Sequence, residues 1–296
     1  MTPIVDTVSA ADISHRYGER IALSDVSFRV PRGAVVGLVG ANGSGKSTLL
    51  RIIAGVTRPT SGCLSVAGTD LAAESAGSGV GAAIDGMSLW SGWTVEQNLR
   101  YLAGLAGVAP SAVDDAAKMT DIAGELKTRL RRLSLGNRQR VSIAAAVLCG
   151  TRLVLLDEPM NGLDPDARRR TRDLILTLAR QGRTVVFSSH DLHDVETVCR
   201  ELIVLDTGRL MFSGPVEDYA EQLAVIVLGI SAHDTDRATE ALSGENLRWW
   251  TDRSGLPVVP LDDAPAAEQA LRAVGVPVTH RDRRSATLEE RFDARQ

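Results

Sequence analysis

The chain has few cysteines and no cluster of metal-binding side chains, and both shortages exclude classes of protein. Its three cysteines, Cys63, Cys149 and Cys199, are odd in number and lie far apart in apolar segments. This spacing excludes a disulfide framework and favours small core residues in a reducing compartment. The five histidines form no spaced group with cysteines or carboxylates, so we expect no zinc site.

Net charge and long apolar runs are also scarce. A formal net charge of −4 over 296 residues gives no bulk electrostatic reason to expect nucleic acid or an anionic membrane as partner. The longest lipophilic run, residues 223–230, is far shorter than the roughly 20 residues of a membrane helix. Residues 1–6 lack the basic and apolar regions of a signal peptide. Any link to a membrane is therefore expected to be peripheral.

A phosphate-binding loop is what the sequence does contain. Residues 40–48 read Gly-Ala-Asn-Gly-Ser-Gly-Lys-Ser-Thr, between an apolar run at 35–39 that predicts a buried strand and a helical pattern at 49–53. An ordinary glycine-rich turn is the alternative, and the strand–loop–helix setting disfavours it. Lys46 can reach the β- and γ-phosphates, and Ser47 can hold Mg²⁺. The predicted nucleotide-binding residues of this loop are Gly40, Asn42, Gly43, Ser44, Gly45, Lys46, Ser47 and Thr48.

Two adjacent carboxylates follow a second apolar run, residues 153–156. Asp157 would support Mg²⁺ and its waters, and Glu158 would accept a proton from an attacking water. On its own, such a pair is more often a solvated turn. The phosphate loop upstream favours the catalytic interpretation.

Three further segments add candidate residues, each with a plain structural alternative. Ser134 is expected to cap the start of a helical segment, and residues 133–140 could also bind a second phosphate. His190 ends a predicted strand and could donate to a γ-phosphate, although a histidine there is more often structural. Tyr17 could stack on adenine, or simply be exposed or packed in the core.

Hydrophobic periodicity outlines an α/β architecture in the first two thirds of the chain. Residues 3–36 alternate like β-structure, and the Gly/Ala/Ser-rich residues 72–83 suggest a connector. Residues 94–148 are mostly helical in pattern. The unbroken apolar runs at 153–156 and 184–187 are typical of parallel strands covered on both faces.

The pattern changes after about residue 215. The elements expected there are strand 224–230, helix 234–242, strands 247–251 and 256–261, helix 264–274, strand 277–280 and helix 285–294. This order predicts a small ferredoxin-like domain followed by a last helix.

The ordered set of motifs resembles the ATP-binding cassette (ABC) ATPases, the motor subunits of ABC transporters, over residues 4–216. The resemblance implies an α/β P-loop NTPase fold with a β-subdomain and a mostly parallel core sheet. It implies a nucleotide-binding domain at 1–216, with a helical signature subdomain at about 86–148, and a C-terminal accessory domain at 217–296. In the family's terms, 40–48 is the Walker A loop and 153–158 the Walker B strand. Tyr17 would be the adenine-stacking aromatic, Asp164 the D-loop aspartate and His190 the switch histidine.

The family signature matches residues 133–140 with one departure, and a second departure lies upstream. The usual Leu-Ser-Gly-Gly-Gln reads Leu-Ser-Leu-Gly-Asn, so the residues expected to act on the ATP of a second copy are Ser134, Leu135, Gly136 and Asn137. The family's Q-loop glutamine aligns with Asp85, which joins Ser47 and Asp157 as an expected metal ligand. Both departures, and residues 286–292, resemble a subgroup of ABC-2-type exporters that includes drug and bacteriocin resistance systems.

The resemblance therefore implies an ATP-hydrolysing subunit of an exporter, using ATP and Mg²⁺ and moving a drug, antibiotic or peptide. Expected partners are a separate membrane permease and a second nucleotide-binding subunit, as a homodimer, without nucleic acid. The expected place is the cytoplasm, peripherally on the inner face of the cell membrane. An importer subunit is one alternative. A soluble ABC ATPase acting on ribosomes or DNA is another, disfavoured by the single cassette and the lack of sustained heptads. The short arginine runs near 129–132 and 168–170 are expected to be solvated.

Overall fold

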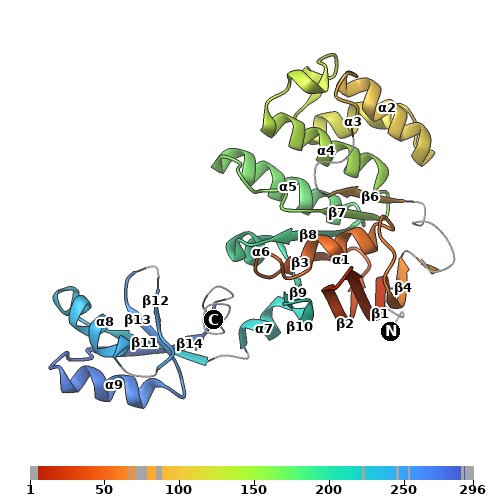
Figure 1. Cartoon of the computed structure of the whole chain (residues 1–296). Helices are drawn as coiled ribbons and strands as arrows, with labels where there is room; N and C mark the ends of the chain where they lie inside the picture. Colours follow the sequence, from red (N-terminus) through yellow and green to blue (C-terminus); the bar gives the residue numbers. More distant parts are fainter. Residues whose placement is uncertain are drawn as a thin grey trace. The chain divides into compact units, whose positions relative to one another are not determined.

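The computed structural model describes residues 6–66, 68–70, 79–84, 89–221, 224–244, 247–252, 254–287 and 290. The chain divides into two compact units, Met1–Gly214 and Pro215–Gln296, two residues before the boundary expected from the sequence. Figure 1 labels most of the helices and strands of both units.

The first unit contains two sheets. The four-stranded sheet has the order β2-β1-β4-β5, formed by β1 (Asp6–Tyr17), β2 (Arg20–Pro31), β4 (Ser61–Val66) and β5 (Thr69–Asp70), with antiparallel neighbours. The six-stranded sheet has the order β10-β9-β3-β8-β7-β6. Its strands are β3 (Val35–Val39), β6 (Val80–Ala83), β7 (Leu153–Leu156), β8 (Thr184–Ser189), β9 (Glu201–Asp206) and β10 (Arg209–Pro215). From β9 to β6, neighbouring strands are parallel.

Burial of the parallel strands confirms the expectation drawn from their apolar runs. Every residue of β3, β7 and β8 is buried, as a sheet covered on both faces requires. On one face, α1 (Lys46–Ile53) shares a hydrophobic core with strands of both sheets. On the other, α5 (Pro165–Arg180) and α6 (Leu192–Val198) pack against β3 and β8.

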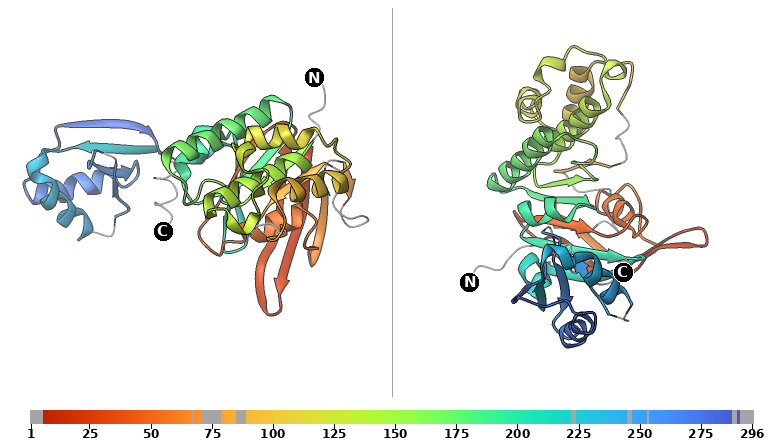
Figure 2. Two further views of the ribbon diagram at one scale, coloured as in Figure 1. Left: turned by 90° about the horizontal axis from the view of Figure 1, so that it is seen from above. Right: turned by 90° about the vertical axis from the view of Figure 1, so that its left-hand side faces the viewer.

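A group of helices forms a second part of this unit, as Figure 2 shows in two views. It comprises α2 (Val95–Ala106), α3 (Ala112–Met119) and α4 (Leu135–Cys149), with short 3₁₀ turns at Ala123–Glu125 and Leu130–Arg132. Val141, Ala144, Ala145 and Leu148 are buried in its core, which confirms the helical face expected from their spacing. Helix α4 also packs against β6 and β7. The predicted signature residues therefore lie at the start of a helix that is packed on the parallel sheet.

The connector expected at 72–83 is wrong at its C-terminal end. Residues 71–78 lie outside the described residues, but Val80–Ala83 form β6, in parallel register with β7. A Cβ atom at Gly81 would collide with the carbonyl oxygen of Ala146 in α4. Small residues are needed here because a helix lies directly on the strand. At Gly81, the absence of a side chain therefore reflects close packing and not a linker.

The cysteines only partly behave as expected. Cys199 is buried, and burial raises the pKa of its thiol well above the usual value. Cys149 is partly buried, whereas Cys63 is exposed on β4, so it is not a core residue.

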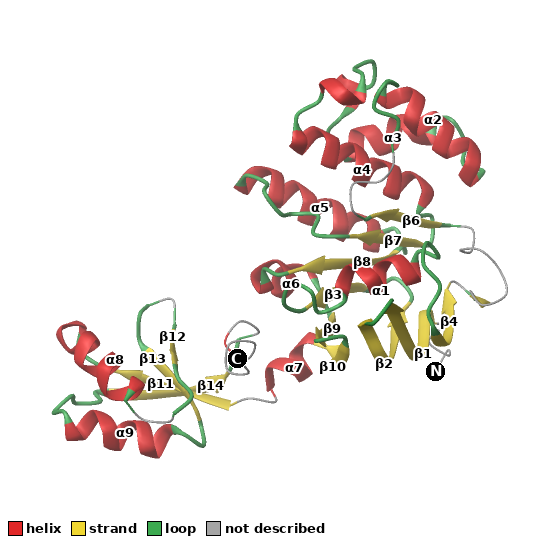
Figure 3. Cartoon of the chain, viewed as in Figure 1, coloured by secondary structure: helices red, strands yellow, loops and turns green. Residues whose placement is uncertain are grey.

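The second unit has a four-stranded sheet with the order β12-β13-β11-β14, and all its neighbours are antiparallel. Its elements, marked in Figure 3, are α7 (Val216–Glu221), β11 (Ala224–Gly229), α8 (Thr235–Ser243), β12 (Trp250–Thr251), β13 (Pro257–Pro260), α9 (Ala264–Ala273) and β14 (His280–Ser285), with a 3₁₀ turn at Ala232–Asp234. The βαββαβ order with the first and third strands at the centre is the ferredoxin-like arrangement predicted.

The ends of this unit differ from the sequence prediction. The last strand is His280–Ser285 and not 277–280, so Ser285 closes a strand where a helix start was expected. Most of the helix expected at 285–294 lies outside the described residues. Glu290 is described, and it is helical. β14 pairs with β11 along one edge, and its exposed, charged sequence hides the alternation of a strand.

Within the described parts of the chain, no helix combines the length and the apolar character needed to cross a membrane.

Candidate functional site

A pocket of about 860 Å³ in the first unit gathers residues from segments far apart in the sequence. The predicted site residues that line it are Tyr17, Asn42, Gly43, Gly45, Lys46, Ser47, Thr48, Leu135, Asp157 and Glu158. The predicted residues outside its lining are Gly40, Ser44, Ser134, Gly136, Asn137, Asp164 and His190. Asp85 lies outside the described residues.

The loop at 40–48 has the backbone of an anion cradle. Gly43 and Gly45 have φ angles of +85° and +106°, in the left-handed region that favours glycine. A Cβ atom at Gly45 would lie 2.7 Å from the carbonyl oxygen of Ala22, so a side chain does not fit there. Helix α1 begins directly after it, and the first N–H groups of a helix have no partner within the helix. The loop and the helix start can therefore point N–H donors at an anion.

Two predicted residues of the loop build it without lining the pocket. Ser44 is buried, and a Cβ atom at Gly40 would collide with the Ser44 side chain and the Leu205 carbonyl oxygen. The start of the loop is thus packed against the end of β9.

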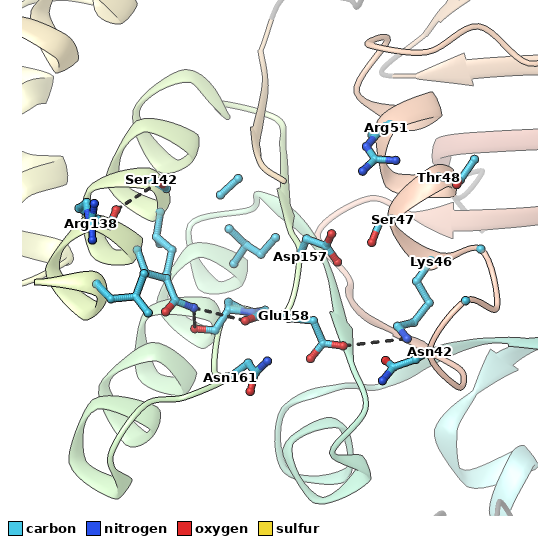
Figure 4. Close-up of a pocket in the computed structure, with 18 of the residues that line it drawn as sticks. Asn42, Lys46, Ser47, Thr48, Arg51, Arg138, Ser142, Asp157, Glu158 and Asn161 are labelled. Atoms are coloured by element: carbon cyan, nitrogen blue, oxygen red, sulfur yellow. Dashed lines mark hydrogen bonds and ion pairs between the residues drawn. The ribbon is translucent and has the colours of Figure 1, made fainter. Parts of the chain in front are cut away.

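Lys46 holds a buried positive charge over this loop. Its side chain is 7% exposed, and Nζ donates to the carbonyl oxygens of Gly40 at 2.7 Å and Ala41 at 3.3 Å. Burial lowers the pKa of the Lys46 ammonium, and the charges of Glu158 and Asp157 oppose this effect. Nζ lies 4.0 Å from Oε1 of Glu158, the ion pair drawn in Figure 4.

Asp157 is fixed by a buried serine on the neighbouring strand. The hydroxyl of Ser188, in β8, donates to Oδ1 of Asp157 at 2.6 Å. The Asp157 N–H continues the sheet by donating to the Ala83 carbonyl at 2.9 Å. In Figure 4 the Asp157 carboxylate faces Ser47 across the pocket.

Glu158 leaves the strand through an uncommon backbone conformation. Its φ angle is +48°, and its N–H donates to Oγ of Ser188 at 2.8 Å. Oε2 of Glu158 lies 2.7 Å from Nδ1 of His190, just beyond β8. The structure therefore joins His190 to Glu158, although His190 is not part of the pocket lining.

The start of α4 faces the same pocket. Ser134 caps the helix by accepting the Asn137 N–H at 3.2 Å, which confirms the predicted N-cap. Leu135 is 76% exposed and lines the pocket. Gln139 donates from Nε2 to the carbonyl oxygens of Glu158 at 3.3 Å and Pro159 at 3.1 Å, which links this helix to the carboxylate segment.

Asp164 has a clear structural role. It caps α5 by accepting the Ala167 N–H at 2.9 Å, and this hydrogen bond lowers the pKa of its carboxyl group.

Tyr17 is the last residue of β1 and 47% exposed, which excludes the alternative of core packing. Its ring meets His15 edge-on, with 4.6 Å between ring centroids. Arg20 is its partner across the turn, and both line the pocket next to Gly43. Tyr17 thus offers an aromatic face at the edge of the pocket.

The oxygen atoms of Ser47 and Asp157 fit a magnesium ion that is shared with a phosphate group. Among the described residues, no cluster of three or more His, Cys, Asp or Glu side chains could hold a metal alone. Magnesium commonly binds through one or two carboxylates together with substrate phosphates and water. The donor set therefore suits a metal that enters with a nucleotide.

The sequence prediction assigned no individual role to Arg20, Gln139 and Ser188, which belong to this site. Arg20 carries no signal in the pattern around it, whereas Gln139 lies inside the predicted signature segment 133–140. Ser188 does carry a signal, because it follows the apolar run of β8 as Asp157 follows that of β7.

Comparisons with known proteins agree with this geometry. The family model described as ABC transporter matches residues 23–161. The Nod factor export ATP-binding protein I of Rhizobium etli is 31% identical over 222 residues, covering 73% of this chain and 70% of that protein. The ABC transporter ATP-binding protein NatA of Bacillus subtilis is 31% identical over 225 residues, covering 72% of this chain and 92% of that protein. A solved ATP-binding subunit of an ABC transporter matches with a TM-score of 0.68 and 28% identity, over 73% of this chain and 92% of that structure.

Proposed function

The chain belongs to the ABC transporter family as an ATP-binding subunit, and from this premise we propose that it hydrolyses ATP to power an exporter. ATP-binding domains of this family hydrolyse ATP to drive transport, and they work with separate membrane permeases. The convergence of Lys46, Glu158 and His190 beside the glycine loop carries the proposal of catalysis. The name of the Nod factor export relative supports the direction of transport.

In this proposal the pocket binds ATP through its loop and its aromatic rim. The N–H groups of the loop and Lys46 hold the phosphates, and Tyr17 stacks on the adenine. Ser47 and Asp157 would hold Mg²⁺, which neutralises phosphate charge when bound. Asp85, at the position of the family's Q-loop glutamine, is proposed as a further ligand to this ion.

Hydrolysis would use Glu158 as the general base. Its carboxylate lies between Lys46 and His190. Lys46 orients Oε1 and His190 orients Oε2. The contact through Nδ1 leaves Nε2 of His190 for the γ-phosphate. Lys46 and His190 then stabilise charge on the transferring phosphoryl group.

A second copy of the chain would complete the site. Leu135 is largely exposed at the start of α4, and Ser134, Gly136 and Asn137 lie in the same turn. We propose that this turn binds the ATP of the partner copy in a homodimer, with Asp164 near the shared interface. The proposed place is the cytoplasmic face of the cell membrane, bound to a permease.

Glu158→Gln tests the catalytic proposal. We expect ATP affinity to remain and phosphate release to fall about 10²–10⁴-fold, because an amide cannot accept the proton. The variant should also form an ATP-bound dimer that is stable in size-exclusion chromatography. Glu240→Gln, on the exposed side of α8, is the control and should behave as the parent. Near-normal phosphate release by Glu158→Gln would contradict the assignment of the base.

Co-purification tests the partner and the direction of transport. We expect the chain to bind a membrane protein encoded next to it, with about six apolar segments of 20 residues. ATP-dependent efflux by cells that hold both proteins would support export, and uptake would support the importer alternative. Binding to ribosomes or DNA in place of a membrane protein would favour the non-transporter alternative.

A further inference from the structure

We propose that Ser188 is a positioning residue whose one hydroxyl group holds the carboxylate of Asp157 and the backbone N–H of Glu158. The inference rests on the proposed role of Glu158 and goes beyond it. Ser188 is fully buried and contacts Asp157 and Glu158 directly, at 2.6 Å and 2.8 Å.

Strand register explains why this serine reaches the site. β7 and β8 are parallel, with Leu156 paired to Phe187 as their last registered pair. The next residues along the two strands, Asp157 and Ser188, therefore lie side by side. Side chains at paired positions of neighbouring strands point to the same face of a sheet.

The hydroxyl uses its hydrogen-bonding capacity on the two carboxylate residues. A serine has one hydrogen to donate, and Ser188 gives it to Oδ1 of Asp157. One of its lone pairs accepts the N–H of Glu158. The contact leaves Oδ2 of Asp157 for a metal ion or its water, and it fixes the rotation of the carboxylate.

The second hydrogen bond supports a strained backbone. A glutamate with φ of +48° is uncommon, because this left-handed conformation strains the backbone of a residue with a side chain. Ser188 holds the N–H of Glu158, and Gln139 holds its carbonyl oxygen. Both backbone polar groups of Glu158 are therefore hydrogen-bonded in its left-handed conformation. This conformation directs the Glu158 side chain toward Lys46 and His190.

The opposite end of β8 provides a matched control. Thr184 is also fully buried, and its hydroxyl bonds Thr7 at 2.8 Å and the Gly33 N–H at 2.9 Å. These partners lie away from the pocket. Ser188→Ala and Thr184→Val each remove a buried hydroxyl with two hydrogen bonds, but only the first touches the site.

Steady-state ATPase activity and nucleotide binding test the proposal. We expect Ser188→Ala to lower kcat about 10–100-fold, the usual effect of losing a group that orients a metal-site ligand. It should raise the Mg²⁺ concentration needed for half-maximal activity. ATP affinity without Mg²⁺, measured with a fluorescent ATP analogue, should stay within about twofold of the parent. Ser188→Thr should restore most of kcat, because the hydroxyl returns.

Thr184→Val should lower the unfolding temperature as much as Ser188→Ala while kcat stays near that of the parent. Equal losses of kcat in both variants, or unchanged kcat and Mg²⁺ dependence in Ser188→Ala, would overturn the proposal. Ser188→Cys, with a similar volume and a weak donor, replaces the alanine variant if the latter does not fold. Loss of turnover in Glu158→Gln together with normal turnover in Ser188→Ala would remove only the positioning role. Normal turnover in Glu158→Gln would remove the proposed function itself.

Discussion

In the first unit, β7 and β8 run parallel, whereas the central strands of the second unit run antiparallel. Asp157 directly follows β7 and Ser188 lies near the end of β8, so the two side chains bond between neighbouring strands. Parallel strands bring all their carboxyl ends to one edge, where following turns and helix starts also gather. Antiparallel strands alternate their ends, so polar turns are divided between two edges. The direction of the strands thus explains why the candidate site lies in the first unit.

Backbone conformation differs in the same way. Among the described residues, the non-glycine residues with positive φ all lie in the first unit: Asp12, Asp25, Asp121, Glu158 and Thr207. Only Glu158 among them lines the pocket. The first unit therefore carries local strain at its site, while the described non-glycine residues of the second have no positive φ and its helices cover one hydrophobic core of the sheet.

Arg172→Ala should give the largest loss of stability, and it should affect the first unit. Asp194 is fully buried in α6, and its Oδ1 accepts hydrogen bonds from Arg172. Its Oδ2 lies 3.3 Å from a guanidinium nitrogen of Arg168. Removing Arg172 leaves this carboxylate poorly paired, at a cost of about 3–5 kcal/mol. Urea unfolding measures the loss. The matched control Arg169→Ala removes only an exposed pair with Asp166 and should cost less than about 1 kcal/mol; equal losses in both variants would contradict the role of the buried pair.

Leu228→Ala should damage the second unit and spare the first. Leu228 is fully buried between β11 and the helices, and its truncation leaves a cavity that costs about 3 kcal/mol. Calorimetry should show an earlier unfolding transition for this unit, with unchanged ATPase activity. A parallel loss of activity would show that the two units are energetically coupled.

Glu290→Gln should remove a pH-dependent part of the second unit's stability. Burial alone would raise the pKa of Glu290, but the hydrogen bond and charge of Arg284 and the Thr287 N–H lower it. A lowered pKa stabilises the folded state above the ordinary glutamate pKa of about 4.3, and this contribution is lost as the pH falls through the lowered pKa. We expect a loss of about 1.5 kcal/mol at pH 7 and a weaker pH dependence below 4.3. Unfolding measured from pH 7 to pH 3 checks both.

A chain that ends at Tyr219 should show the smallest effect. The motifs of the pocket all precede this residue, so we expect ATP affinity within about twofold of the full chain. Titration with a fluorescent ATP analogue measures it. An insoluble or non-binding product would mean that the cassette needs the rest of the chain.

Arginine-rich segments illustrate what sequence patterns conceal. The run at 168–170 predicts a solvated face, and Arg169 is indeed exposed. Arg168, however, pairs with Asp191 and Asp194, and it is only 30% exposed. The prediction is wrong for Arg168 because its acidic partners lie more than 20 residues away in another helix.

The sequence by itself determined the phosphate loop, the carboxylate pair, the capped start of α4 and the βαββαβ order of the second unit. Each of these features is encoded by residues that are neighbours in the sequence. A loop depends on the glycines within it, and a helix or strand depends on the periodicity of its own residues. The tertiary structure alone decided that residues 80–83 form a strand, that His190 meets Glu158, and that Ser188 bonds the Asp157 carboxylate and the Glu158 N–H. Each of these depends on pairing between distant segments, because strand register and helix packing bring together side chains that no local pattern connects.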